Sequence, residues 1–125
     1  MTARRIILVI DDDKHLVEGL EDYLESKGYV VYSALTGVQA YPMASARKPA
    51  LIILDIDMPI MNGLKALERL RAEPDTKHIP VILMTGITSS DVYPKVKNMP
   101  LVSHVKKPVE PEDLLSLVRY YIPES

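Results

Sequence analysis

Acidic residues follow two short aliphatic runs in this chain, and their types and spacing could support metal or phosphoryl chemistry. Asp11 and Asp12 come directly after residues 6–10, and Asp55 comes directly after residues 51–54. Both runs are continuous and apolar, which is typical of a buried strand in a parallel sheet. The carboxylates would then stand at the carboxyl ends of two strands, where ligands bind in open α/β sheets.

Two further polar residues end predicted strands later in the chain. Thr85 closes the run at residues 80–85, and Lys107 follows a short run at residues 102–105. Crowded carboxylates repel one another, and a hard divalent cation such as Mg²⁺ relieves that repulsion. A carboxylate beside bound Mg²⁺ can attack phosphorus and form an aspartyl phosphate. Thr85 could then donate a hydrogen bond to the phosphoryl oxygens, and Lys107 could pair with them.

Strand and helix patterns alternate five times along the chain. The predicted strands cover residues 6–10, 30–34, 51–54, 80–85 and 102–105, and the predicted helices cover 14–27, 36–47, a segment from 62 or 63, 89–99 and a segment from 112. Pro42 should kink the second helix or delay its start, and Pro94 and Pro100 should leave the fourth short or irregular. Right-handed crossovers predict a parallel sheet with helices on both faces, which is a three-layer α/β/α sandwich with five strands and five helices. In a flavodoxin-like arrangement the strand order is 2-1-3-4-5, and strands one and three are neighbours.

The composition narrows the class of protein. The 125 residues carry a net charge of −2, which predicts neither nucleic-acid binding nor attraction to a membrane. No cysteine is present, so disulfides, thiolate nucleophiles and Cys-ligated zinc are excluded. No apolar run reaches the roughly 20 residues of a membrane span. The first apolar run is also too short for a signal peptide. We expect one cytoplasmic domain over residues 1–125.

Four segments, taken together and in order, resemble the signature of the two-component response-regulator receiver domain. They are Asp11-Asp12, residues 55–63 (DIDMPIMNG), Thr85-Gly86 and Lys107-Pro108. The resemblance spans nearly the whole chain. It implies a signalling domain that accepts a phosphoryl group from a sensor histidine kinase or a phosphotransfer protein, changes conformation and then dephosphorylates itself. Such a domain is not an enzyme acting on a separate substrate.

The resemblance also implies a role for each aspartate of these segments. Asp55 would be the phosphoacceptor. Asp12, Asp55 and the backbone carbonyl of Asp57 would hold Mg²⁺, with Asp11 acting mainly through water. Asp57 would otherwise present its side chain to solvent near the site.

Residues on the later strands receive roles by the same resemblance. Lys107 would pair with the phosphoryl group, and a cis bond to Pro108 would aim it into the site. Thr85 would hydrogen-bond to the phosphoryl group and act as a switch residue together with an aromatic side chain on the fifth strand. His104 occupies that position here, so the aromatic half of the switch departs from the family pattern. A histidine could still rotate, and it would add sensitivity to pH.

The output of the domain stays open at this point. The face formed by helix four, strand five and helix five is one that the family uses to bind a downstream protein or a second copy.

Two other functions compete: a pseudo-receiver that binds partners without phosphorylation, and a haloacid-dehalogenase-type phosphatase, whose Asp-x-Asp fragment fits Asp55-Ile56-Asp57. No output domain follows the predicted last helix, so we expect either a stand-alone receiver or part of a larger regulator or hybrid kinase.

Overall fold

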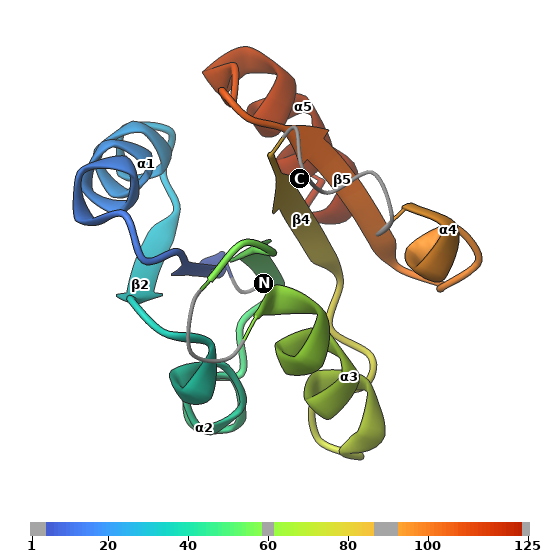
Figure 1. Cartoon of the computed structure of the whole chain (residues 1–125). Helices are drawn as coiled ribbons and strands as arrows, with labels where there is room; N and C mark the ends of the chain where they lie inside the picture. Colours follow the sequence, from blue (N-terminus) through green and yellow to red (C-terminus); the bar gives the residue numbers. More distant parts are fainter. Residues whose placement is uncertain (1–4, 59–61, 87–92, 124–125) are drawn as a thin grey trace.

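The computed structural model describes residues 5–58, 62–86 and 93–123, and strands alternate with helices along it (Figure 1). The elements are β1 (Ile6–Ile10), α1 (Lys14–Ser26), β2 (Val30–Ala34), the 3₁₀ turn η1 (Gly37–Gln39), α2 (Ala40–Arg47), β3 (Leu51–Asp55), α3 (Gly63–Ala72), β4 (Val81–Thr85), α4 (Tyr93–Val96), β5 (Val102–Lys106) and α5 (Pro111–Tyr121).

All five strands form one parallel sheet in the order β2-β1-β3-β4-β5. This confirms the predicted sheet and its strand order. The register places Ile10 of β1 opposite Leu54 of β3, and Asp55 opposite Met84 of β4. The strands therefore finish nearly level with one another, so the residues that follow them meet at one edge of the sheet.

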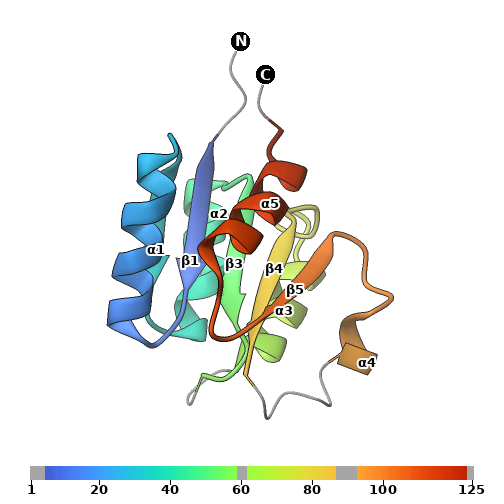
Figure 2. The same cartoon turned by 90° about the horizontal axis from the view of Figure 1, so that it is seen from above.

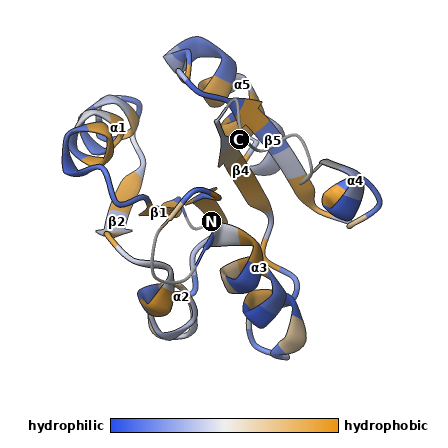
Figure 3. Ribbon diagram, viewed as in Figure 1, coloured by the Kyte–Doolittle hydropathy of each residue, from blue (hydrophilic) through white to orange (hydrophobic). Residues whose placement is uncertain are grey.

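Two hydrophobic clusters cover the two faces of the sheet, because successive side chains of a strand point to opposite faces. Helices α1 and α5 lie on one side of the sheet, and α2 and α3 lie on the other (Figure 1). The inner surfaces of the helices are apolar and their outer surfaces are polar (Figure 3). The first cluster includes Val17, Leu20, Leu24, Leu114 and Val118, and the second includes Ala40, Ala44, Leu67, Leu70 and Val96.

Side-chain caps start the two helices that adjoin the acidic residues. The Asp13 carboxylate accepts hydrogen bonds from the backbone N–H groups of His15 and Leu16 at the start of α1. Asn62 caps α3 in the same way. Both residue types are preferred at this position because a short side-chain oxygen satisfies helical N–H groups that lack a partner. The predicted start of each helix is thereby confirmed.

Prolines affect the second and fourth helices differently. The α-helix α2 starts at Ala40, after the turn η1, so Pro42 lies in its first helical turn and the regular helix starts later than residue 36. Proline is tolerated there because the first N–H groups of a helix have no helical partner. The described part of the fourth helix is the four-residue α4. Part of its predicted range, residues 89–92, lies outside the described residues.

The direction of the strands separates the two ends of the molecule (Figure 2). The start of β1 and the end of α5 lie at one end. The carboxyl ends of the strands lie at the opposite end, where the predicted site residues gather.

Candidate functional site

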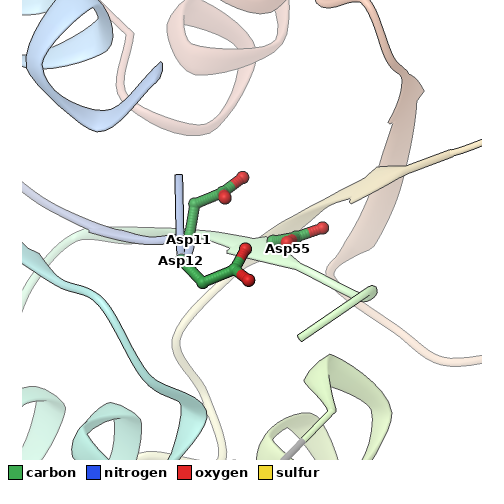
Figure 4. A group of neighbouring side chains, drawn as sticks. All are labelled: Asp11, Asp12 and Asp55. Atoms are coloured by element: carbon green, nitrogen blue, oxygen red, sulfur yellow. The ribbon is translucent and has the colours of Figure 1, made fainter. Parts of the chain in front are cut away.

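Three carboxylates gather where β1 and β3 end (Figure 4). Asp11 and Asp12 follow β1, and Asp55 is the last residue of β3. Asp11 is 0% exposed and Asp55 is 1% exposed, whereas Asp12 is exposed to solvent. Two carboxylates are thus buried at the bottom of the site, and a third stands at its rim.

Backbone amides orient the two buried carboxylates. The N–H of Asp13 donates to Asp11 Oδ1 at 2.9 Å, and the N–H of Asp57 donates to Asp55 Oδ1 at 3.1 Å. Each donor lies two residues after its acceptor, so the turn that leaves each strand positions its own carboxylate. Such local side-chain to backbone bonds are typical of aspartate in turns.

Glycine at position 63 lets the start of α3 pack against the strand that carries Asp55. A Cβ at Gly63 would lie 2.2 Å from the carbonyl oxygen of Asp55, which no side chain can do. The Gly63 N–H donates to the Ile56 carbonyl at 3.0 Å. The glycine in the segment DIDMPIMNG therefore allows a close backbone approach directly behind the buried carboxylate.

Lys107 lies between the two buried carboxylates. Its Nζ is 2.9 Å from Asp11 Oδ2 and 3.1 Å from Asp55 Oδ1, and its side chain is 25% exposed. The peptide bond from Lys107 to Pro108 is cis, as the family resemblance implied. One ammonium group therefore neutralises part of the charge that β1 and β3 bring together.

Burial and neighbouring charge shift the ionisation of this group. Burial raises the pKa of the Asp11 carboxyl and the charge of Asp55 adds to the rise, whereas the Asp13 amide and Lys107 oppose it. Burial alone would lower the pKa of Lys107, but contacts with Asp11 and Asp55 outweigh burial and raise that pKa. The lysine therefore stays charged at neutral pH, and the carboxylates keep a fixed counter-ion.

The carboxylates also fit a hard divalent cation. Asp11, Asp12 and Asp55 each offer an oxygen, and these three oxygens lie within 4.8 Å of one another. Carboxylate oxygens are the ligands that Mg²⁺ prefers. This places together the three carboxylates of the predicted metal site. Coordination of the ion by the Asp57 carbonyl stays a prediction, and so does a water molecule between Asp11 and the ion.

The two predicted switch residues lie on adjacent strands. Thr85 is the last residue of β4 and is nearly buried, and its hydroxyl donates to the Val105 carbonyl of β5 at 3.3 Å. His104 lies on β5 opposite Leu83, with its side chain exposed. The structure thus brings Thr85 to the edge of the sheet that carries Asp55, and it places His104 on the outer strand. Their role in switching stays a prediction.

One contact of Asp57 was not anticipated from the sequence. Its side chain is exposed near the site, as expected, but Oδ2 also accepts a hydrogen bond from the Gly86 N–H at 3.0 Å. The two residues are 29 positions apart. Local periodicity carries no signal for such a contact. Only the shared position of both residues after adjacent strands could have indicated it.

The part of the chain that the structure describes holds no helix that is both long and apolar enough to cross a membrane.

Comparison with known protein families gives one match across most of the chain. The sequence model of the response regulator receiver domain matches residues 7–119. Similar proteins include a probable transcriptional regulator, ycf29, of Porphyra purpurea, which is 36% identical over 93% of this chain. The chain spans 56% of that relative's length. Sporulation initiation phosphotransferase F of Bacillus subtilis is 28% identical over 94% of this chain and 93% of its own length.

Solved structures give the same result for the fold. The chemotaxis protein CheY4 of Vibrio cholerae superposes with a TM-score of 0.86 at 27% identity, over 95% of this chain and 99% of that one. A CheY-like response regulator receiver domain from Methanospirillum hungatei superposes with a TM-score of 0.87, also at 27% identity, over 96% of this chain and 94% of that one. The strand order and the layers found in this chain are those of these proteins.

Proposed function

This chain belongs to the response regulator receiver domain family, and on that premise we propose that it is a phosphorylation-dependent switch with Asp55 as phosphoacceptor. Receiver domains are signalling domains of two-component systems, and not classical enzymes. We propose further that residues 1–125 form one such domain, that it works in the cytoplasm, and that its phosphoryl donor is a histidine kinase or a phosphotransfer protein.

One observation carries the assignment of Asp55. It is the carboxylate at the end of the fully buried strand β3, with Lys107 at 3.1 Å and with Asp11 and Asp12 beside it. A nucleophile needs a fixed position and nearby groups that offset the charge developing in the transition state. Asp55 has both. Asp12 lacks the fixed position because it is exposed to solvent. Asp11 is buried and contacts Lys107 as Asp55 does, but it does not begin the segment DIDMPIMNG that resembles the family signature.

The reaction follows from the residues present. An Asp55 carboxylate oxygen forms a bond to phosphorus as the bond from phosphorus to the donor's histidine nitrogen breaks, and the imidazole leaves with the electron pair and takes up a proton. Lys107 then pairs with the phosphoryl oxygens, and Thr85 turns its hydroxyl from the Val105 carbonyl to donate to one of them. Self-dephosphorylation is the attack of water on the same phosphorus, which restores the Asp55 carboxylate.

The acidic residues would hold Mg²⁺ through Asp12 and Asp55 and the Asp57 carbonyl, with Asp11 acting through water. When bound, the ion would supply charge neutralisation at the phosphoryl oxygens. The oxygen donors and their spacing support this assignment. Lys107 would keep its place as the second cation of the site, and its raised pKa keeps it charged for that task.

We propose that the face of α4, β5 and α5 binds a downstream protein or a second copy of the domain. Thr85 donates to β5, and β5 carries His104, so movement of the threonine reaches this face directly. His104 would then respond to that movement.

Intact-mass spectrometry tests the phosphoacceptor. The chain is incubated with Mg²⁺ and acetyl phosphate, and we expect the mass of one added phosphoryl group. Asp55→Asn should show no adduct. Asp22→Asn, which makes the same chemical change on the outer surface of α1, should keep it. An equal adduct on Asp55→Asn would overturn the assignment. No adduct on the wild type would favour the pseudo-receiver that binds partners without phosphorylation.

A further inference from the structure

The contact between Asp57 and Gly86 joins the two segments that leave the central strands. Asp57 follows β3 by two residues, and Gly86 follows β4 directly. Asp55 pairs with Met84 in the sheet, so Gly86 lies two residues beyond the partner of Asp55. The Gly86 N–H is therefore a hydrogen-bond donor at the edge where the phosphoryl group would be carried.

Asp57 engages this edge with two different groups. Its backbone N–H donates to Asp55 Oδ1 at 3.1 Å, and its carboxylate oxygen Oδ2 accepts from the Gly86 N–H at 3.0 Å. The second bond shows that the Gly86 amide is placed to bind an anionic oxygen beside the site. In the unphosphorylated chain that oxygen comes from the side chain of Asp57.

The lack of a side chain at Gly86 is an independent feature of the same contact. A Cβ at this position would lie 2.9 Å from Asp57 Oδ2, closer than a real Cβ approaches an oxygen. Because the nearest atom is the end of a side chain, a larger residue would displace the carboxylate and leave the backbone in place. The Asp57 carboxylate can therefore reach the amide only because residue 86 has no side chain.

We propose that the Asp57 carboxylate and a phosphoryl group on Asp55 compete for the Gly86 amide. Before phosphorylation, Asp57 holds the amide. After it, a phosphoryl oxygen replaces the carboxylate, because two anionic oxygens repel each other and the phosphoryl group is more strongly charged. Asp57 is then a positioning residue that favours the unphosphorylated state. This inference rests on the proposed function of Asp55, and it assigns to Asp57 a role in regulating that site.

Beryllofluoride, a tetrahedral mimic of a carboxylate-bound phosphoryl group, tests the competition at equilibrium. Its affinity is measured in Mg²⁺ from the amide NMR spectrum of ¹⁵N-labelled protein, in which the five glycine signals are readily separated. We expect Asp57→Ala to bind beryllofluoride about five- to tenfold more tightly than the wild type, which corresponds to one hydrogen bond removed from the free state. The variant keeps its own backbone N–H and carbonyl. Asp22→Ala should bind as the wild type does.

The Gly86 amide signal reports the contact without any ligand. In the free wild type it should have the shift of an amide bonded to a carboxylate, and Asp57→Ala should move it upfield. Gly86→Ala keeps the N–H but crowds the carboxylate, so it should also tighten beryllofluoride binding. Adding Asp57→Ala to Gly86→Ala should then bring little further gain, since both changes remove the same contact.

The outcomes separate the two proposals. A wild type that binds no beryllofluoride would overturn the phosphoacceptor role of Asp55, whatever the Gly86 signal does. A wild type that binds it, with Asp57→Ala binding equally or more weakly, would overturn the competition alone. An unmoved Gly86 signal in the free Asp57→Ala variant would show that the contact does not hold in solution, and it would overturn the competition too. Thermal unfolding of each variant verifies that it is folded.

Discussion

The central strands and the edge strand supply the site with residues of opposite charge from very different surroundings. Every residue of β3 and β4 is buried, whereas every residue of β5 is half-buried or exposed. The carboxylate Asp55 ends β3, and the cation Lys107 follows β5. The phosphoacceptor is therefore fixed by a core on both faces of its strand, while the cation comes from a strand with solvent on one side.

This difference indicates how the site divides its tasks. A segment with few buried contacts opens and shifts at a lower cost in free energy than a core strand. Chemistry at Asp55 needs a fixed nucleophile, and a response to chemistry needs an element that can move. The central strands meet the first need, and β5, with Lys107 after it, meets the second. The following four predictions are arranged in order of decreasing effect, and the first three test this contrast.

The largest effect on stability is expected at Val81, and a valine directly opposite it on β5 provides the comparison. Val81 of β4 pairs with Val102 of β5, and only Val81 is fully buried. Val81→Ala should lower the free energy of unfolding by about 2–3 kcal/mol, because it removes buried methyl groups and leaves a cavity. Val102→Ala should cost about 1 kcal/mol or less, since water already reaches that site. Urea denaturation measures both. Equal losses would contradict the contrast between the strands.

Removal of the cation should have the next largest effect. Lys107→Met leaves Asp11 and Asp55 side by side without their counter-ion, so the metal-free protein should lose about 2 kcal/mol, less than for a fully buried pair because Lys107 is partly exposed. Mg²⁺ should bind this variant more tightly, since one positive charge has gone. Lys106→Met, at the exposed neighbouring residue, is the control. Calorimetric titration with Mg²⁺ decides, and weaker binding to Lys107→Met would count against the charge balance described above.

A smaller, stabilising effect is expected just before β5. Leu101 has φ 61°, in the left-handed region that disfavours a branched side chain, and it is 47% exposed. Leu101→Gly should raise the free energy of unfolding by about 0.5–1 kcal/mol, because relief of this strain exceeds the small loss of burial. Lys48→Gly, at the left-handed position after α2, should give a similar gain. Thermal unfolding measures both. A gain at Lys48 with a loss at Leu101 would show that the edge is packed more tightly than its exposure suggests.

The smallest effect should depend on pH and concerns Asp75, which lies between α3 and β4 and is bonded to residues of α2. A hydrogen bond from Ser45 Oγ at 2.5 Å, supported by one from the Tyr41 hydroxyl, holds the pKa of Asp75 below its usual 3.8 although desolvation works the other way. A depressed carboxyl pKa stabilises the fold above the unfolded value and loses that contribution as pH falls through the folded value. Ser45→Ala should therefore lower the unfolding temperature at neutral pH.

The pH profile separates this effect from a simple loss of packing. The difference between Ser45→Ala and wild type should shrink as the pH falls below 3.8 and through the lowered pKa of folded Asp75. Ser116→Ala removes a hydroxyl that donates to a backbone carbonyl of α5, so its effect should not change with pH. If the Ser45→Ala difference were constant across pH, the hydrogen bond would not be the source of the shift.

The sequence predicted the parts of the molecule that depend on local pattern. Continuous apolar runs gave the central strands, and carboxylates directly after them gave Asp11, Asp12 and Asp55 at one edge of the sheet. The alternation of strands and helices then predicted a parallel sheet covered on both faces, and the flavodoxin-like arrangement supplied its strand order. The site residues follow from those two steps.

Contacts between distant side chains could not be predicted in the same way. The bond from Gly86 to Asp57, and the bonds from Ser45 and Tyr41 to Asp75, join residues about 30 positions apart. They depend on the position of each loop to within a few tenths of an ångström, and a hydropathy pattern carries no such information. The described part of α4 is short, by contrast, as Pro94 and Pro100 led us to expect.

The parallel direction of the strands has a use in protein engineering. Both the start of β1 and the end of α5 lie at the end of the molecule remote from Asp55 (Figure 2). A fluorescent protein or an affinity tag joined at either end would leave the acidic edge open to small phosphodonors and to a kinase. Two fluorescent proteins, one joined at each end of the chain, would both lie at the end of the molecule remote from Asp55. A change in energy transfer between them would therefore report movement of α5, and the site at the opposite end would stay undisturbed.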